Sequence, residues 1–207
     1  MLRQWAMAQR FSLQRRALFN SALWFAAIVL AACNPSSPPS PPPEPTKTPL
    51  QQYEALKKSA KGISVGPAAS EYTVYVMFDP QCQHCARLWE ESLPLQATVR
   101  FVWVPVTIMD SRSVALSAAL LSSTTPQQDL GQQEASVLKR GQGIAGMNPV
   151  PPYLDAVIKS NTDLINRFHV LGVPYVVARN QTTSEYVAHE GVMSREVLKR
   201  FLGLGSR

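Results

Sequence analysis

Two cysteines stand directly after an apolar run, and this arrangement leaves few folds open to the chain. Tyr72 to Phe78, YTVYVMF, is rich in β-branched and aromatic residues and predicts a buried strand. Asp79-Pro80-Gln81 interrupts the strand, and Cys82 and Cys85 follow with two residues between them. Apolar residues recur at helical spacing from Cys85 onward, so a helix is predicted to begin at or near Cys82. The pattern predicts a strand, a turn and a helix that carries both cysteines.

The remaining sequence predicts an alternation of helices and strands. Apolar periodicity, turn residues and helix-ending glycines set the expected boundaries. The predicted elements are a short helix at Leu50–Lys61, a strand at Arg100–Val106, helix from about Ser111 to Arg140 with a break at Thr124–Pro126, two short helices ending near Phe168, strands at Leu171–Ala178 and Glu185–Glu190, and a closing helix at Ser194–Gly203. The expected fold class is therefore α/β.

The first 32 residues are predicted to be a signal peptide. Arg3, Arg10, Arg15 and Arg16 precede the apolar run ALWFAAIVLAA, which has the length of a signal core and is too short for a comfortable membrane span. An uncleaved anchor is the alternative. Leu30-Ala31-Ala32-Cys33 resembles the lipobox of bacterial lipoproteins, and this resemblance implies that Cys33 is lipidated and becomes the mature N-terminus. The same resemblance implies that Asn34 after the cysteine, in place of an aspartate, favours the outer membrane.

Residues 33–49 are predicted to be a tether between that lipid and a globular domain. Eight prolines lie between Pro35 and Pro49, and proline prevents helix and sheet pairing, so the segment should be extended.

The net charge of +6 does not indicate nucleic-acid binding, because four arginines belong to the predicted signal peptide. Without them 16 basic and 14 acidic residues remain. A charge so close to neutral gives no electrostatic reason to expect nucleic-acid binding.

The segments FDPQCQHCARLWEE, LGVPYVVA and GVMSREVLKRFLG resemble the catalytic domain of bacterial periplasmic thiol–disulfide interchange (Dsb) proteins, above all the isomerase and reductase-like DsbC and DsbG type. The resemblance implies a thioredoxin-like fold over residues 71–207, preceded by a short helix and lead-in at residues 50–70. Cys85 and Pro174 are separated by 88 residues. The family therefore implies a helical subdomain, about residues 107–168, inserted between the cysteine helix and the proline strand.

The positions of Cys82 and Cys85 predict different chemical roles. Cys82 is expected at the first turn of a helix, where free N–H groups and the helix dipole favour a thiolate, and a protonated His84 would favour it further. Cys82 is the predicted nucleophile, and Cys85 is the predicted resolving thiol. Three alternatives are less well supported: a structural disulfide would close a very short loop, zinc would require two more ligands from few histidines, and an inactive fold would keep the cysteines without use.

Val173 and Pro174 are predicted to form the second part of the site. The resemblance implies that the Val173–Pro174 bond is cis and faces the cysteine pair. The backbone of Val173 would then pair with an extended substrate segment. A trans proline at the start of a strand is the alternative reading.

We therefore expect a lipid-anchored periplasmic thiol–disulfide oxidoreductase of isomerase or reductase type that uses no cofactor and no metal. The expected partners are cysteine-containing exported proteins, the membrane and a membrane redox protein that resets the cysteines. The oxidase DsbA has the same residue types as His84 and Val173 at the matching positions, so a dithiol oxidase is one alternative. An assembly factor of an envelope secretion or conjugation machine is another. About twenty residues, Leu50–Ala69, separate the tether from the first strand, too few for the dimerisation domain of the isomerases, so a monomer is expected.

Overall fold

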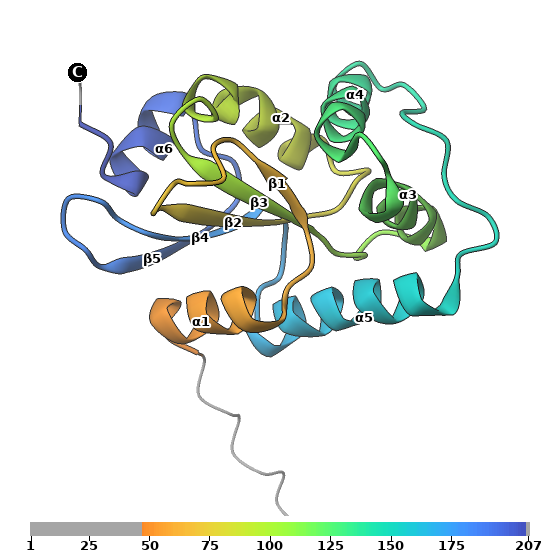
Figure 1. Ribbon diagram of the computed structural model, residues 1–207, viewed down its shortest axis with the longest axis horizontal. Coiled ribbons are helices and arrows are strands. Elements are labelled where there is room, and N and C mark those ends of the chain that lie inside the picture. Colours follow the sequence, from red (N-terminus) through yellow and green to blue (C-terminus); the bar gives the residue numbers. More distant parts are fainter. Residues whose placement is uncertain (1–46, 206–207) are drawn as a thin grey trace, which may run out of the picture. The chain divides into compact units, whose positions relative to one another are not determined.

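The computed structural model describes residues 47–205, and their five strands form one mixed sheet with helices on both faces (Figure 1). The central strand β2 pairs in parallel with β3 and antiparallel with β4, and the two outer strands pair antiparallel with their neighbours. In spatial order the strands are β1 (Ile63–Val65), β3 (Arg100–Pro105), β2 (Thr73–Phe78), β4 (Tyr175–Arg179) and β5 (Tyr186–Glu190).

Seven helical segments accompany the sheet in this part of the chain. They are α1 (Pro49–Ser59), α2 (Gln83–Ser92), the 3-10 segment η1 (Leu93–Leu95), α3 (Ser111–Ser122), α4 (Pro126–Leu138), α5 (Pro152–Arg167) and α6 (Arg195–Leu202). Helices α3, α4 and α5 lie between β3 and β4 in the chain, as the predicted helical insertion requires. The predicted α/β fold with its inserted helices is therefore confirmed.

Alternate residues of β2 point to two separate layers of core. Val76 and Phe78 pack with side chains from α2, α4 and α6, while Tyr75 and Met77 pack with side chains from α1 and α5. Trp103 of β3 is fully buried in the first layer. Because both faces of β2 are covered, the strand is apolar along nearly its whole length. The two layers hold the end of β2, and hence the cysteine turn, in a fixed position.

Two details of the fold differ from the sequence prediction. Ile63–Val65 forms the edge strand β1, which was not predicted because three residues are too short to show a period. A single helix, α5, replaces the two short helices expected before Phe168. Ser160, Asn161 and Thr162 are weak helix formers. Asn161, however, is fully buried and bonds to backbone groups outside the helix, which holds the helix together at that point.

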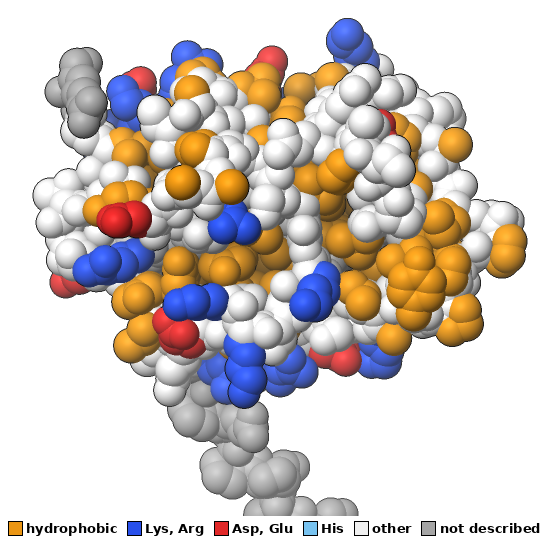
Figure 2. All heavy atoms as spheres, in the orientation of Figure 1, with side chains coloured by type: hydrophobic (Ala, Val, Ile, Leu, Met, Phe, Trp, Pro, Cys, Tyr) orange, Lys and Arg blue, Asp and Glu red, His pale blue; other side chains and the backbone are white. Residues whose placement is uncertain are grey.

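The surface carries hydrophobic groups near the start of α5, in the loop that follows β3 and in the loop that precedes β4. Met109, Tyr153 and Leu171 are exposed by 59%, 66% and 93%. Figure 2 shows hydrophobic side chains gathered at the end of the molecule where α3 and α5 lie, and charged side chains of both signs spread over the rest of this face. No helix among residues 47–205 has the length and apolarity needed to cross a membrane. The predicted signal peptide, Cys33 and nearly all of the tether lie outside the described residues.

Candidate active site

The turn between β2 and α2 places Cys82 at the start of a helix. The backbone N–H of Cys82 donates to the carbonyl of Asp79 at 2.9 Å and closes the turn. Cys82 occupies the N-cap position of α2 with an extended backbone, and its side chain forms no capping hydrogen bond. The first N–H groups of α2 are therefore free to interact with the sulfur region. The helix begins at Gln83, within one residue of the predicted start.

The surroundings of Cys82 favour its thiolate form. Its pKa is lowered to about 6 from an ordinary value of 9.0, and the largest cause of lowering is a hydrogen bond from the Cys85 side chain. The backbone N–H groups of Cys85 and His84 lower the pKa further, and the charge of the exposed His84 adds the smallest contribution. Partial burial of the sulfur acts in the opposite direction. At neutral pH Cys82 is therefore mostly thiolate, the form that attacks disulfides.

Cys85 has the opposite environment. Its side chain is fully buried, and its thiol is not joined to Cys82 in a disulfide. Burial raises the pKa of Cys85 well above its ordinary value, and the hydrogen bond to Cys82 and the negative charges of Cys82 and Glu134 raise it further. Cys85 is therefore protonated and out of contact with solvent while Cys82 is ionised and partly exposed. The roles of Cys82 as nucleophile and Cys85 as resolving thiol stay a prediction.

The loop before β4 approaches the same sulfur from the other side. The Val173–Pro174 peptide bond is cis, as the resemblance implied. The Sγ of Cys82 lies 3.6 Å from the carbonyl oxygen of Val173, within reach of a hydrogen bond from the protonated thiol. Because β4 pairs with β2, the residues before β4 are brought to the sheet edge where Cys82 begins its helix. The structure therefore brings Cys82, Cys85 and Val173 together.

Asp79 fixes the cysteine turn from below. This aspartate is fully buried, and its two carboxylate oxygens accept four hydrogen bonds. The donors are the backbone N–H groups of Gln81, Ile108 and Met109 and the hydroxyl of Ser113, at 2.7–3.2 Å. A buried carboxylate is tolerated when its oxygens are bonded in this way. Asp79 thus ties the cysteine turn to the loop that enters α3.

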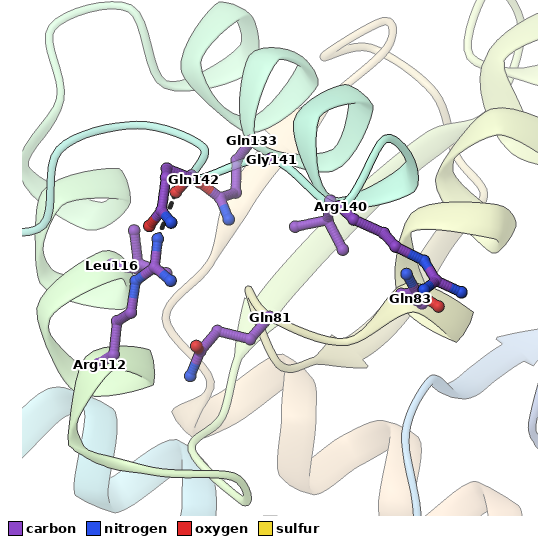
Figure 3. A pocket seen from close by; sticks show the side chains of 9 residues that line it. Gln81, Gln83, Arg112, Leu116, Gln133, Arg140, Gly141 and Gln142 are labelled. Atoms are coloured by element: carbon purple, nitrogen blue, oxygen red, sulfur yellow. Dashed lines mark hydrogen bonds between the residues drawn. The ribbon is translucent and has the colours of Figure 1, made fainter.

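Helix α4 reaches the site from the inserted region. Gln133 donates from Nε2 to the carbonyl of Pro80 at 2.7 Å and accepts at Oε1 from the backbone of Ile144. Gln81 donates to Asp110 and to Ser113 of α3. Figure 3 shows Gln81 and Gln133 beside a pocket between the cysteine turn and the inserted helices. The insertion is therefore attached directly to the residues that precede Cys82.

Glu134 is a second buried carboxyl group near the cysteines. The residue has no exposed surface, and neither of its carboxyl oxygens has a hydrogen-bond partner among the described residues. Burial raises its pKa well above the ordinary value of 4.5, and the negative charges of Cys82 and Asp79 raise it further. The carboxyl group of Glu134 therefore resists ionisation, and it lies close enough to the cysteine pair for its charge and theirs to interact.

Sequence reasoning found the cysteines and the Val-Pro pair but missed Asp79, Gln133 and Glu134 as parts of the site. The sequence signal for Asp79 is a carboxylate at the end of a buried strand, next to the cysteines. Glu134 lies 49 positions after Cys85, and no local pattern connects it to them. Among the described residues, no group of three or more potential ligands is arranged for a metal ion.

Residues 61–205 match the thioredoxin-like domain family, and this match covers well over half of the chain. The chain belongs to the thioredoxin-like domain family. The match begins just before β1 and ends after α6, so it includes the whole sheet, the cysteine pair, the inserted helices and Pro174.

Individual relatives of this thioredoxin-like domain are distant. A thiol:disulfide interchange protein DsbG of Pseudomonas aeruginosa is 26% identical over 132 residues, which cover 63% of this chain. The aligned region is 50% of that relative, so the chain spans about half of its length.

Solved structures share the fold at still lower identity. A periplasmic thioredoxin-like protein of Salmonella enterica serovar Typhimurium has a TM-score of 0.57 at 17% identity, covering 73% of this chain and 94% of that one. The thiol–disulfide exchange protein α-DsbA2 of Wolbachia pipientis has a TM-score of 0.59 at 14% identity, covering 76% and 94%. These likenesses establish the architecture around the cysteines.

Proposed function

We propose that this protein is a thiol–disulfide oxidoreductase that exchanges disulfides with cysteine-containing exported proteins through Cys82 and Cys85. The observation that carries the proposal is the contrast between the two thiols. Cys82 is partly exposed at a helix N-terminus with a pKa of about 6, and Cys85 is buried with a raised pKa. A structural pair would have no need of one activated and one protected thiol.

The exchange proceeds in two steps. The thiolate of Cys82 attacks one sulfur of a client disulfide, a new S–S bond forms, and the other client sulfur leaves as a thiolate. Cys85 then loses its proton and attacks the Cys82 sulfur, which releases the client as a dithiol and forms the Cys82–Cys85 disulfide. Two electrons pass from the cysteine pair to the client, and a redox partner must return them before the next cycle.

The Val173–Pro174 segment supports the client during this exchange. The carbonyl of Val173 faces the Cys82 sulfur at 3.6 Å, so an extended client segment bound to that sulfur can pair with the Val173 backbone as an added strand. Pro174 has no N–H to compete for the client's acceptors. We propose both residues as the substrate-binding part of the site.

The direction of exchange that we propose is reductase or isomerase-like, in line with the DsbG relative. The alternative is a dithiol oxidase, which the low pKa of Cys82 favours, because a stabilised thiolate makes the disulfide a stronger oxidant. The pKa of about 6 lies between those of thioredoxin, ≈ 7, and DsbA, ≈ 3.5. We therefore expect a reduction potential between those of the two proteins, roughly −270 mV and roughly −120 mV.

A single series of assays tests the proposed function and its direction. The full chain is added in its reduced form to a disulfide-bonded protein, in its oxidised form to a reduced protein, and in its reduced form to a protein with scrambled disulfides. Reduction or rescue of the scrambled protein, with loss of both activities in Cys82→Ser, supports the reductase or isomerase role. Efficient oxidation alone, with a potential near that of DsbA, supports the alternative. No exchange in any of the three assays would contradict both.

We also propose that the protein acts in the periplasm while a lipid on Cys33 anchors it to a membrane, and that this membrane is the outer one. The support lies in the sequence of residues 1–49: the basic start, the apolar run, LAAC and the proline-rich segment. The tether would hold the catalytic domain away from the membrane, within reach of exported clients. A membrane redox partner would reset the cysteines.

A further inference from the structure

A polar pocket of about 140 Å³ adjoins the cysteine turn on the side of the inserted helices. Gln81 and Gln83, the neighbours of Cys82 in the chain, form part of its wall, and the rest comes from α3, from α4 and from the loop after α4. Figure 3 shows Arg112 and Gln142 on one side of the pocket and Arg140 near Gln83 on the other. We call this cavity the arginine pocket.

The two arginines of the pocket have spare hydrogen-bonding capacity. Arg112 donates from one guanidinium nitrogen to the carbonyl of Gln142, and the side chain of Arg140 makes no hydrogen bond or ion pair with any other described residue. The two ion pairs found within residues 47–205 join Lys159 to Asp163 and Lys199 to Glu196, away from the pocket.

One carboxylate, Asp110, lies nearby but is already engaged. It accepts hydrogen bonds from Gln81 and from the backbone N–H of Arg112, at 2.6 and 2.9 Å, and it forms no ion pair with the Arg112 guanidinium. The hydrogen bond from Gln81 and the charge of Arg112 lower the pKa of Asp110. Its charge offsets one of the two arginines, which leaves the pocket with a positive balance.

The place of the pocket relative to Cys82 determines what can enter it. In the sheet β2 lies between β3 and β4. Val173 precedes β4 and contacts the Cys82 sulfur, whereas α3 follows β3 and contributes Arg112 to the pocket. A client segment bonded to Cys82 therefore has Val173 on one flank and the arginine pocket on the other. Residues close to the client's cysteine are the ones that can reach the pocket.

We infer that the arginine pocket binds an acidic side chain, aspartate or glutamate, located within a few residues of the client's cysteine. This inference rests on the proposed function and adds a sequence preference to it. Guanidinium groups bind carboxylates through paired, charge-assisted hydrogen bonds. The amides of Gln83 and Gln142 form no side-chain hydrogen bond with other described residues, so they supply further donors. Gln81 and Gln133 are occupied by the protein itself and shape the wall.

The test uses two synthetic peptides that differ only in one residue near a single cysteine, glutamate in one and glutamine in the other. Each peptide thiolate attacks the Cys82 sulfur of the oxidised full chain, which breaks the Cys82–Cys85 bond and leaves a mixed disulfide. A second peptide thiolate then attacks the mixed disulfide, giving a peptide dimer and the reduced pair. The measured quantity is the ratio of the two rate constants, each divided by the same peptide's rate with a small uncharged disulfide.

We expect the glutamate peptide to react about two- to fivefold faster at low salt, the range of an exposed charge pair, with the ratio falling as salt is added. In Arg112→Gln/Arg140→Gln the ratio should approach one. Lys139→Gln, which removes an exposed charge adjacent to Arg140 but outside the pocket, should keep the ratio of the parent chain. Arg140→Glu should instead favour a peptide with lysine at the same position.

Three results would overturn the inference: equal normalised rates in the parent chain, an unchanged ratio in the double variant, or an equal drop in Lys139→Gln. In each of these cases the peptides still react, so the proposed function would stand. Failure of both peptides to reduce the Cys82–Cys85 disulfide would instead contradict the proposed function, and the pocket's role with it.

Discussion

At the scale of single residues, the low pKa of Cys82 results chiefly from its neighbour Cys85 and from the helix start, and only slightly from His84. The hydrogen bond from the Cys85 side chain leads the causes that lower the Cys82 pKa, and the charge of His84 comes last. The sequence had suggested a larger part for His84 because of its place between the cysteines. An exposed imidazole interacts through water, which weakens its influence.

The pH dependence of alkylation tests this order of effects. In the reduced protein, a thiol-alkylating reagent should modify Cys82 with a midpoint near pH 6 and leave Cys85 unmodified until much higher pH. His84→Ala should move the midpoint upward by a small amount, and Cys85→Ala should move it upward by more. A larger shift in His84→Ala than in Cys85→Ala would reverse the order proposed here.

Glu134 provides a stability prediction at the same scale. Its folded-state pKa is raised above the unfolded value of about 4.5, so the folded state resists ionisation. The resulting cost in unfolding free energy is absent below about pH 4.5, and it grows as pH rises towards the folded-state pKa. Glu134→Gln removes the cost, so the variant should gain stability relative to the parent chain as pH rises from 4 to 8. Glu90→Gln, an exposed change in α2, is the control and should show no such trend. Parallel denaturation midpoints across this pH range would contradict the assignment.

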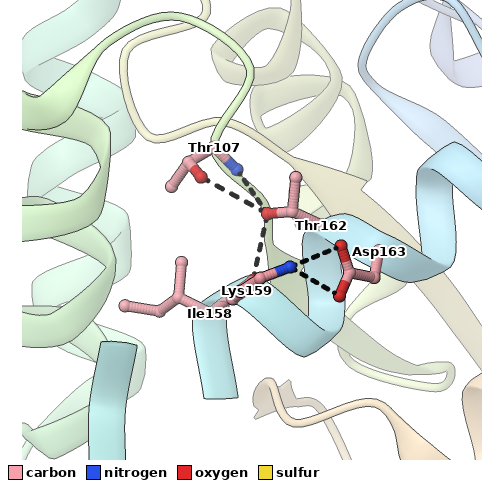
Figure 4. Close-up of polar contacts among 5 residues, drawn as sticks. All are labelled: Thr107, Ile158, Lys159, Thr162 and Asp163. Carbon is pink, nitrogen blue, oxygen red and sulfur yellow. Dashed lines mark hydrogen bonds and ion pairs between the residues drawn. The ribbon is translucent and has the colours of Figure 1, made fainter. Parts of the chain in front are cut away.

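At the scale of elements, α5 is hydrogen-bonded to the end of β3 through side chains that are weak helix formers. Thr162 accepts a hydrogen bond from the backbone of Thr107 at 3.1 Å and donates to the carbonyl of Ile158, as Figure 4 shows. The neighbouring Asn161 accepts from the backbone N–H of Lys61 and donates to the carbonyls of Lys61 and Pro105. These bonds connect α5 to the start of β1 and to β3.

Replacement of Asn161 tests the importance of this connection. Asn161→Ala leaves the buried carbonyl of Pro105 and the part-buried backbone groups of Lys61 without partners, which should cost about 2–4 kcal/mol of unfolding free energy. Lys159→Ala in the same helix removes only an exposed ion pair with Asp163 and should cost no more than about 0.5 kcal/mol. Denaturant unfolding of both variants measures the difference. Equal, small losses would mean that water satisfies the groups that Asn161 now bonds.

The sequence predicted elements with a strong period and missed those defined by distant contacts. The β2 strand, the helix after Cys82 and the closing helix carry their own apolar pattern, so their bounds were close. Strand β1 has three residues and is held by its pairing with β3, which a local pattern cannot reveal. The same limit applies to the site: Cys82 and Cys85 form a local motif, whereas Glu134 and Gln133 arrive from α4 through folding.

At the scale of the whole molecule, we propose that residues 1–49 attach the catalytic domain to a membrane. Cys33→Ser removes the thiol that the lipid requires. We expect the variant to leave the membrane fraction, or to keep its signal peptide, while the activity of the purified domain is retained. Cys33→Ala should behave in the same way, because neither side chain can be lipidated. Normal processing and unchanged membrane association in both variants would contradict the lipid anchor.

The central claim is that Cys82 attacks and Cys85 resolves, and trapping of the mixed disulfide tests it most directly. The reduced full chain is mixed with a disulfide-bonded test protein, and covalent complexes are separated and mapped by mass spectrometry. Cys85→Ser cannot resolve the intermediate, so it should accumulate a complex bonded through Cys82. Cys82→Ser should form none, because Cys85 is buried and protonated. Equal trapping by the two variants, or a complex bonded through Cys85, would contradict the account.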